Sequence, residues 1–291
     1  MERRNRHGST DARRSDRRDP GASERHQANV REAIRTELAS DGEGAEPATG
    51  AVVALDHVSL AFDRPILSDV SFAAERGDTL AIVGESGTGK STILKLILRL
   101  LVPDGGRVMI EGKDITGLTF DEALEVRQHM GMVFQGAALF DSMSVFENVA
   151  YPLREHTDMS EEEIEERVRE KLDFVDLDPD RVMWQMPAEL SGGMRKRVGI
   201  ARGMANNPRI MLYDEPTSGL DPLTTATITK LIMKVQRERN ATSIVVSHDI
   251  RSVFHMASRV ALLNEQHVTF LGTPEEMTAS EDRYIQNFLG A

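Results

Sequence analysis

Short apolar segments recur along the chain from residue 51 onward, and polar or mixed segments separate them. Several apolar segments show no polar alternation, which is typical of strands buried on both faces of a sheet. The pattern predicts strands at 51–62, 79–83, 107–112, 130–135, 209–214, 243–247 and 260–264. Because helical patterns fall between these strands, we expect an α/β fold.

Two helix starts are marked by capping boxes between the fourth and fifth predicted strands. A capping box pairs a serine at the N-cap with a glutamate three residues later, as in Ser144 with Glu147 and Ser160 with Glu163. The apolar residues that follow the second box at helical spacing are Ile164, Val168, Leu172 and Val175. We therefore predict a helical subdomain at about 136–203, inserted between strands.

Residues 1–50 differ in composition from the rest of the chain. They are rich in Arg, Asp, Ser, Gly and Glu, with 10 arginines against 10 acidic residues, and they offer little apolar surface to bury. We predict a disordered Arg-rich tail here, followed by one globular domain at 51–291. The alternative is a docking role for the arginines, or binding of anionic lipid by them.

The net charge belongs to the globular part, since the formal charge of -12 arises within residues 51–291. An acidic domain argues against nucleic acid as a partner, because phosphate contacts require a basic face. The absence of cysteine excludes disulfides and thiolate zinc sites. The longest apolar segment, 93–102, contains Lys95 and Arg99 and is shorter than the roughly 20 residues that cross a bilayer.

A glycine-rich segment, GESGTGKST, joins the predicted strand at 79–83 to a helical segment. It matches the pattern G-x-x-x-x-G-K-[ST], and its strand–loop–helix context supports a P-loop. In P-loops, backbone N–H groups surround the phosphates, the lysine reaches the β and γ oxygens, and the Ser/Thr hydroxyl ligates Mg²⁺. The predicted nucleotide-binding residues are Gly84, Glu85, Ser86, Gly87, Thr88, Gly89, Lys90, Ser91 and Thr92.

Two acids, Asp214 and Glu215, end the strand-like segment RIMLYDE. Alone, acids after an apolar segment would fit a helix cap equally well, but with a P-loop in the same chain they indicate the second half of a nucleotide site. We expect Asp214 to join Ser91 in the magnesium shell. We expect Glu215 to act as general base on the attacking water, which makes the chain a hydrolase.

The segment ELSGGMRKR at 189–197 places three bases directly after a Ser-Gly-Gly helix start. A helix N-terminus already carries about half a positive charge, so cations in its first turn are unfavourable and predict a nearby anion. The segment resembles the signature motif of the ABC ATPases, in which the signature of one subunit faces the P-loop of another. The resemblance implies a homodimer in which Ser191, Gly192 and Gly193 grip the γ-phosphate of ATP.

Four further residues match positions of the same family: Phe62, Gln135, Asp221 and His248. The resemblance implies that Phe62 stacks on adenine, although tyrosine is commoner there, and that Gln135 senses the γ-phosphate and ligates Mg²⁺. It implies that Asp221 crosses the dimer interface and that His248 contacts the γ-phosphate. An ordinary strand aromatic and an ordinary helix N-cap are the alternatives for Phe62 and Asp221. The implied fold is a P-loop NTPase core of the ABC type with an antiparallel β portion and an inserted helical subdomain.

The segment 138–157 and the signature LSGGMRKR are similar to the ATPases of Mla- and Mce-type lipid transport systems, and Met194 agrees with that subgroup where the common signature has glutamine. The resemblance implies ATP hydrolysis that drives transport of phospholipids or related lipids, with ATP and Mg²⁺ as cofactors. The implied partners are a transmembrane permease, an Mce-domain lipid-binding subunit and a small accessory protein. The implied location is peripheral, on the cytoplasmic face of the inner membrane.

Two other functions compete with lipid transport. One is the ATPase of a small-solute importer of the amino-acid type. The other is a soluble ABC protein that acts on ribosomes or DNA, but such proteins usually carry two ATPase units, or zinc and basic surfaces, and this sequence has neither.

Two apolar sets have open roles. The first follows Gln135 and either receives a coupling helix of a permease or belongs to the core of the helical subdomain: Ala137, Leu139, Phe140, Met143 and Phe146. The second lies on one side of a predicted C-terminal helix at about 280–289 and packs on its own domain, or contacts the second ATPase subunit or an accessory protein: Tyr284, Phe288 and Leu289.

Overall fold

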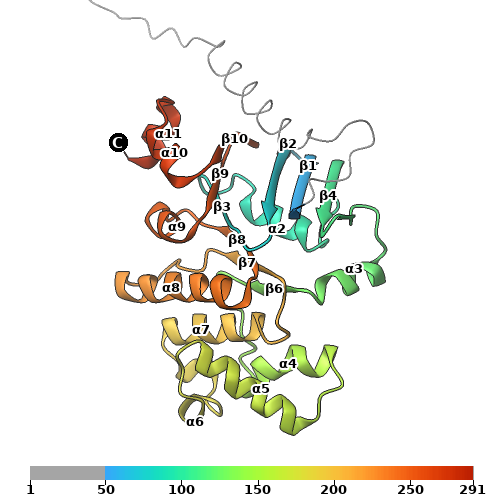
Figure 1. Ribbon diagram of the computed structural model, residues 1–291, viewed down its shortest axis with the longest axis vertical. Helices are drawn as coiled ribbons and strands as arrows, with labels where there is room; N and C mark the ends of the chain where they lie inside the picture. Colours follow the sequence, from blue (N-terminus) through green and yellow to red (C-terminus); the bar gives the residue numbers. More distant parts are fainter. Residues whose placement is uncertain (1–49, 291) are drawn as a thin grey trace, which may run out of the picture.

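A six-stranded sheet with the strand order β10-β9-β3-β8-β7-β6 forms the centre of the protein (Figure 1). The computed structural model describes residues 50–290, so the predicted tail at 1–50 lies outside the described residues apart from Gly50. The strands are β3 (Thr79–Val83), β6 (Met130–Val133), β7 (Ile210–Asp214), β8 (Thr242–Val246), β9 (Arg259–Asn264) and β10 (His267–Gly272). All neighbouring pairs are parallel except β9 with β10.

A second, antiparallel sheet has the order β2-β1-β4-β5. Its strands are β1 (Ala51–Ala61), β2 (Pro65–Glu75), β4 (Gly105–Ile110) and β5 (Lys113–Asp114). Helix α2 (Lys90–Ile97) packs with both sheets, because its buried residues Ile93, Leu94 and Leu96 share one apolar cluster with Leu55 of β1 and Leu80 of β3.

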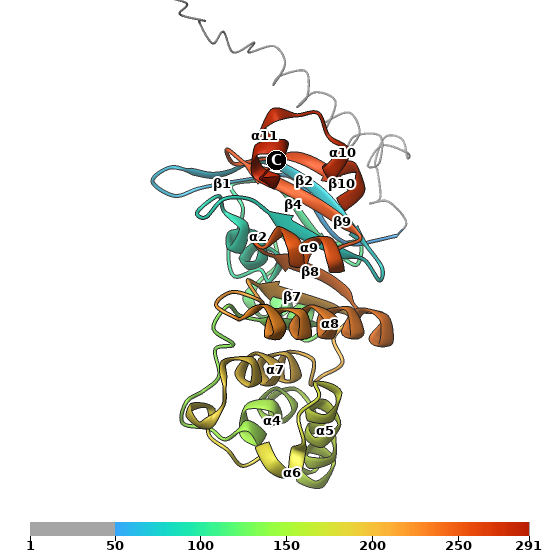
Figure 2. The ribbon, with the colours of Figure 1, turned by 90° about the vertical axis from the view of Figure 1, so that its left-hand side faces the viewer.

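A lobe of helices is inserted between β6 and β7, and Figures 1 and 2 show it extending away from the sheets beyond α8. Its elements are α4 (Val145–His156), α5 (Glu161–Phe174), α6 (Pro179–Val182), the short 3-10 helix Pro187–Glu189 and α7 (Gly192–Gly203). The other helices are α3 (Phe120–Arg127), α8 (Pro222–Arg239), α9 (Ile250–Met256), α10 (Pro274–Ala279) and α11 (Arg283–Leu289). Within the lobe, α7 contacts α4 and α5, and it also contacts α8 and β6 of the core.

Alternate residues of the central strands supply two different apolar cores. In β3, Leu80 and Ile82 join the cluster that contains α2, whereas Ala81 and Val83 join the cluster that contains the lobe. All four side chains are buried. Burial on both faces explains why the central strands have continuous apolar sequences, and it confirms the expectation of an α/β core.

The predicted strands are present, but two of them end earlier than expected and two further strands were not predicted. The first predicted strand ends at Ala61, which leaves Phe62 in the following turn, and the strand predicted at 130–135 ends at Val133. The sequence pattern did not reveal β2, which lies at an edge of the antiparallel sheet and mixes exposed with buried positions. It also did not reveal β10, the edge strand of the larger sheet.

Both predicted capping boxes are confirmed. Ser144 accepts a hydrogen bond from the N–H of Glu147 at 3.2 Å, and the Glu147 carboxylate accepts one from the Ser144 N–H at 2.7 Å. The same reciprocal pair joins Ser160 and Glu163. Each box satisfies two N–H groups that a helix start leaves without an internal partner. At the other end of the chain, α11 directs Tyr284, Phe288 and Leu289 onto the core of the same chain.

Close backbone contact attaches the end of α7 to β6. A Cβ atom at Gly131 would overlap with the carbonyl oxygen of Gly203 and with the sulfur of Met211. We expect Gly131→Ala to lower the free energy of unfolding by about 1–3 kcal/mol, because overpacking forces α7 away from the sheet. Chemical denaturation measures the change. Gly117→Ala is the control, since its Cβ would meet nothing within 4 Å, and equal stability of the two variants would contradict the prediction.

Candidate nucleotide-binding site

The site lies where the parallel strands end. The carboxyl ends of parallel strands meet at one edge of a sheet, which is the usual position of ligand sites in such folds. The chain continues from β3 into the P-loop, from β6 into Gln135, from β7 into Asp214 and Glu215, and from β8 into His248. The structure thus brings together the candidate residues from four segments that are distant in sequence.

The P-loop wraps closely around its own lysine. Lys90 begins α2, and its ammonium donates to the carbonyl oxygens of Gly84 at 2.9 Å and Glu85 at 2.8 Å. Gly84 has a φ of 152° and Gly89 a φ of 102°, values that suit glycine. Burial lowers the pKa of Lys90, while the carboxylates of Glu215 and Asp214 act in the opposite direction.

The remaining P-loop residues form the turn before α2. Glu85, Ser86 and Gly87 are exposed. Thr88 donates from its hydroxyl to the carbonyl of Glu85 at 2.9 Å, and the N–H of Thr92 donates to the carbonyl of Gly89 at 3.0 Å. The turn therefore presents its backbone to solvent at the start of α2, where an anion is favoured.

Ser91 and Asp214 are the two candidate magnesium ligands that touch each other. The Ser91 hydroxyl donates to the Asp214 carboxylate at 2.8 Å, which is close to the ~3 Å that separates neighbouring oxygens around Mg²⁺. Among residues 50–290, no group of three or more His, Cys, Asp and Glu side chains is arranged to hold a metal ion. The pair therefore fits a magnesium ion whose other ligands come from phosphate and water, as Mg²⁺ in nucleotide sites prefers.

Glu215 and His248 form a second pair. The imidazole Nδ1 of His248 lies 2.8 Å from the Glu215 carboxylate. Glu215 has a φ of 48°, which is unusual for a residue with a side chain, and its N–H donates to the carbonyl of Val246 at 2.9 Å. The strained backbone directs the carboxylate toward the end of β8.

Gln135 and Asp221 lie on the loops beside these pairs. The side-chain amide of Gln135 donates to the hydroxyl of Ser218 at 3.4 Å. Asp221 caps α8 by accepting from the N–H groups of Leu223 at 3.0 Å and Thr224 at 3.1 Å. Hydrogen bonds from Thr224 lower the pKa of Asp221. The N-cap interpretation of Asp221 is thus confirmed, and its role between subunits stays a prediction.

Ser191, Gly192 and Gly193 begin α7 next to the segment that contains Asp221. The Ser191 hydroxyl caps the helix by accepting from the N–H of Met194 at 3.2 Å, and Ser191 and Gly192 are exposed. A Cβ atom at Gly193 would lie 2.6 Å from a methyl group of Thr224. The signature segment therefore packs against the start of α8, while Met194 packs against the core of the lobe.

The three bases after the signature are satisfied by backbone carbonyls. Arg195 donates to the carbonyl of Leu190 at 3.0 Å, and Arg197 donates to that of Asp176 at 2.7 Å, just beyond the end of α5. Lys196 donates to the carbonyls of Gln135 and Glu215. Backbone carbonyl oxygens thus receive these cations within the chain, and the phosphate expected at the start of α7 stays a prediction.

Arg202, further along α7, was not singled out by the sequence patterns. Its guanidinium donates to the carbonyls of Ala137 at 2.9 Å and Ala138 at 2.8 Å, and burial lowers its pKa. These carbonyls belong to residues with φ values of 63° and 47°. No local pattern in the sequence signalled this contact, because the two carbonyls lie 64 and 65 positions away along the chain.

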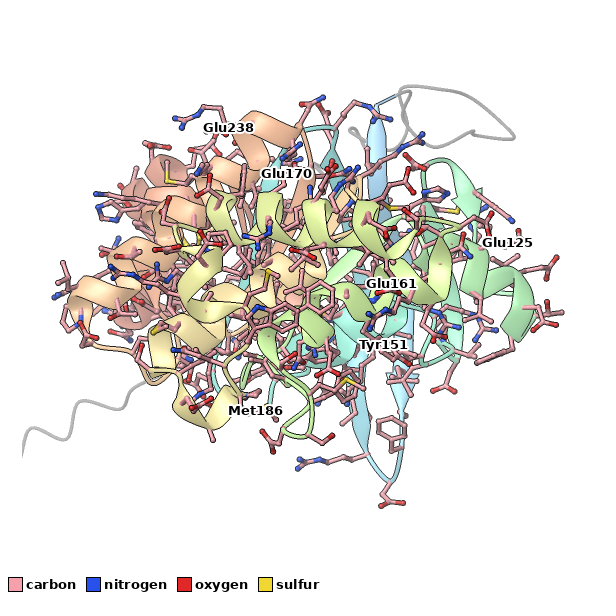
Figure 3. The ribbon with its side chains drawn as sticks, turned by 90° about the horizontal axis from the view of Figure 1, so that it is seen from below. Glu125, Tyr151, Glu161, Glu170, Met186 and Glu238 are labelled. Atoms are coloured by element: carbon pink, nitrogen blue, oxygen red, sulfur yellow. The ribbon has the colours of Figure 1, made fainter. Side chains whose placement is uncertain are left out.

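A cavity of about 300 Å³ lies between the core and the lobe, and we call it the lobe groove. It is formed by α3, β6, α4 and α7 and is lined by Arg127, Gln128, Met130, Gly131, Met132, Phe134, Ala138, Phe140, Tyr151, Pro152, His156, Arg202, Gly203 and Asn206. Figure 3 shows the protein from below, with Tyr151 of α4 just below Glu161 of α5 in the view and Glu125 near α3 on the right.

The structure divides the apolar set that follows Gln135 between the surface and the core. Phe140 is 44% exposed and lies against Tyr151, with ring centroids 5.3 Å apart. Phe146 is 7% exposed and packs against Trp184, so it belongs to the lobe core and not to the surface. Ala137 is also buried, whereas Phe134 and Tyr151, which the sequence did not indicate, are exposed.

No helix in the described part of the chain is both long and apolar enough to cross a membrane.

Comparison with known proteins identifies the family. Residues 67–218 match the ABC transporter family. The intermembrane phospholipid transport system ATP-binding protein MlaF of Haemophilus influenzae is 41% identical over 78% of this chain and 85% of its own length. MlaF of Escherichia coli is 37% identical over 78% of this chain and 84% of its own length. The probable ribonucleotide transport ATP-binding protein mkl of Mycobacterium leprae is 40% identical over 77% of this chain and 64% of its own length.

Solved structures have the same fold. The ATP-binding cassette MJ0796, in a dimeric post-hydrolysis state bound to ADP and Pi, aligns with a TM-score of 0.71 and 34% identity over 76% of this chain and 98% of its own. CbiO1 of Clostridium perfringens, part of the ABC transporter complex cbiONQ, aligns with a TM-score of 0.73 and 28% identity over 83% and 96%. The chain therefore belongs to the ABC transporter family, as one of its ATP-binding and ATP-hydrolysing proteins.

Proposed function

We propose that this protein hydrolyses ATP to drive a membrane transporter of phospholipids or related lipids. The observation that carries the ATPase part is the meeting of Lys90, Ser91, Asp214, Glu215 and His248 at one sheet edge. The lipid part rests on similarity to the MlaF proteins, whose names describe intermembrane phospholipid transport.

Each side chain has a separate task in the proposed reaction. The ammonium of Lys90 and the backbone of the P-loop bind the phosphates, and the exposed ring of Phe62 stacks on the adenine. Ser91, Asp214 and Gln135 would hold Mg²⁺, which neutralises phosphate charge when bound. Glu215 takes a proton from the attacking water, and His248 holds the Glu215 carboxylate in place and contacts the γ-phosphate.

We infer that the active form is a homodimer. The signature segment packs against the start of α8, where a Cβ at Gly193 would touch Thr224, and the resemblance to the ABC ATPases implies that it grips the ATP of a second copy. Leu223, next to Asp221, is 80% exposed, as expected for a residue that a partner covers. The dimeric structure of MJ0796 supports this arrangement.

The lobe groove is the proposed docking site for a permease. Phe134, Phe140 and Tyr151 offer exposed aromatic surface, and Arg127 and Arg202 supply positive charge beside it. Such a groove suits an amphipathic helix with an acidic residue. The complete assembly places the protein at the cytoplasmic face of the inner membrane, with an Mce-domain lipid-binding subunit and a small accessory protein as further partners.

Small-solute transport is the second candidate function. The name of mkl describes probable ribonucleotide transport for that relative, which makes a polar cargo the alternative. Purification of the full complex from membranes, followed by mass spectrometry of its subunits and of extracted lipids, distinguishes the two. A copurified permease with stoichiometric phospholipid supports the proposal, and a complex that binds a polar solute and no lipid contradicts it.

Glu215→Gln is expected to bind ATP but to lower kcat by about 10²–10⁴, because the proton acceptor is lost. Unhydrolysed ATP should then hold two copies together, so light scattering should show a dimer only when ATP is present. Lys90→Ala is the matched variant, and it should weaken ATP binding itself. A Glu215→Gln protein that binds ATP but stays monomeric would contradict the homodimer.

Met194→Gln is expected to change ATP turnover by less than about tenfold, or about 1.4 kcal/mol of barrier, because methionine offers no donor that the signature could be using. Gly192→Asp should cost more, since it places negative charge where the phosphate of a partner site binds. Gly192→Ala is its control, because a Cβ there has only Leu220 nearby, at 3.9 Å. Gly193 is less suitable, since any side chain there disturbs Thr224 of the same chain.

Steady-state ATPase assays of the assembled transporter measure these three variants. An inactive Met194→Gln beside an active Gly192→Asp would show that the start of α7 does not hold the γ-phosphate.

Phe140→Asp is expected to abolish stimulation of the ATPase by the permease while ATP binding is retained, because it removes aromatic docking surface and places a carboxylate beside Arg202, where it competes with the acidic residue of the docking helix. Leu100→Asp is the control, since Leu100 is similarly exposed, at 55%, but does not line the groove. Copurification and lipid transport in reconstituted vesicles measure the effect. Transport at the wild-type rate by Phe140→Asp would show that the permease docks elsewhere.

A further inference from the structure

One face of α7 carries a lysine whose charge is buried against the site. Lys196 is 6% exposed. Its ammonium donates to the carbonyl of Gln135, and to the carbonyl of Glu215 at 3.2 Å. These carbonyls follow two different strands, β6 and β7. A single cation from the lobe therefore joins the backbones of two site residues that belong to the core.

The segment that follows Gln135 is attached to the same face of α7. Arg202 donates to the carbonyls of Ala137 and Ala138, and a Cβ at Gly199 would lie 3.1 Å from the Cβ of Ala137. Lys196, Gly199 and Arg202 are each three positions from the next, so each is a neighbour of the next on the surface of α7. Residues 135–138 are thus fixed to the signature helix at both ends.

The backbone of Glu215 depends on the same contact. Its left-handed φ of 48° is unfavourable for glutamate and persists only where the surroundings fix it. The core fixes one side of this residue through the hydrogen bond from its N–H to Val246, and Lys196 fixes the other side through the carbonyl. The direction of the carboxylate follows from these two restraints.

We propose that Lys196 is a positioning residue for ATP hydrolysis. Its ammonium ties the carbonyls of Gln135 and Glu215 to the signature helix, so that the carboxylate of Glu215 is aligned only when the lobe is correctly seated. The ammonium contacts backbone oxygens and has no part in the proton transfer. The inference rests on the proposed role of Glu215 as the base.

The test compares Lys196→Met with Arg197→Met in the assembled transporter. The first keeps the aliphatic stem and removes the cation; the second removes a neighbouring cation that donates to the carbonyl of Asp176 within the lobe. We expect Lys196→Met to lower kcat by about tenfold or more with KM for ATP changed less than about twofold, which marks a loss confined to the catalytic step. Arg197→Met should keep the wild-type kcat, and Lys196→Arg, which retains a charged donor, should recover most of the activity.

A second measurement separates this inference from the assignment of the base. Hydrogen exchange of the amides at 135–138 and 215–218 should quicken in Lys196→Met and not in Arg197→Met, whether or not Glu215→Gln is inactive. An active Glu215→Gln variant would contradict the role of Glu215 as general base but not the positioning role of Lys196. A wild-type kcat in Lys196→Met, an equal loss in Arg197→Met, or unchanged exchange at both segments would overturn the positioning role. If Lys196→Met does not fold, the same criteria apply to Lys196→Ala.

Discussion

Parallel pairing of β3, β8, β7 and β6 is the constraint on which the site depends. It places the P-loop, Gln135, Asp214 and His248 at the same edge of the sheet, although these segments are far apart in sequence. Because alternate residues of β3, β7 and β8 fill two different cores, a shift of register by one residue would exchange the side chains of these cores and would also separate Ser91 from Asp214. Burial of the sheet and alignment of the magnesium ligands are therefore enforced by the same packing.

The signature helix shows how charges that are unfavourable in sequence become favourable in the fold. Arg195, Lys196 and Arg197 lie in the first turns of α7, where the helix dipole opposes them. Each side chain reaches a carbonyl oxygen outside α7: Arg195 reaches Leu190 just before the helix start, and Arg197 reaches Asp176 just beyond the end of α5, where the dipole of that helix is negative. The cations therefore connect α7 to its surroundings and leave the exposed Ser191 and Gly192 accessible to an anion.

The sequence predicted the parts of the site that local patterns encode. The P-loop, the acids after β7, the capping boxes and the buried strands all depend on residues close to one another in the chain. It missed β2 and β10, because edge strands mix polar and apolar positions, and it could not tell whether Phe146 lies on a surface or in the core, where Trp184 packs against it. The partners of Lys196 were also beyond reach, since Gln135 lies 61 positions away and such a distant pairing leaves no local period.

Helix α7 physically joins the two surfaces that a transporter must couple. Its first residue follows Ser191 of the signature, and its last residue, Gly203, lines the lobe groove beside Arg202. Twelve helical residues span about 18 Å, and a hydrogen-bonded helix shortens very little under load. In the proposed docking mode, a permease segment that enters the groove therefore displaces the signature as well, unless α7 bends. Lys196 lies between these ends and holds the backbone of Glu215, so the same displacement reaches the catalytic carboxylate.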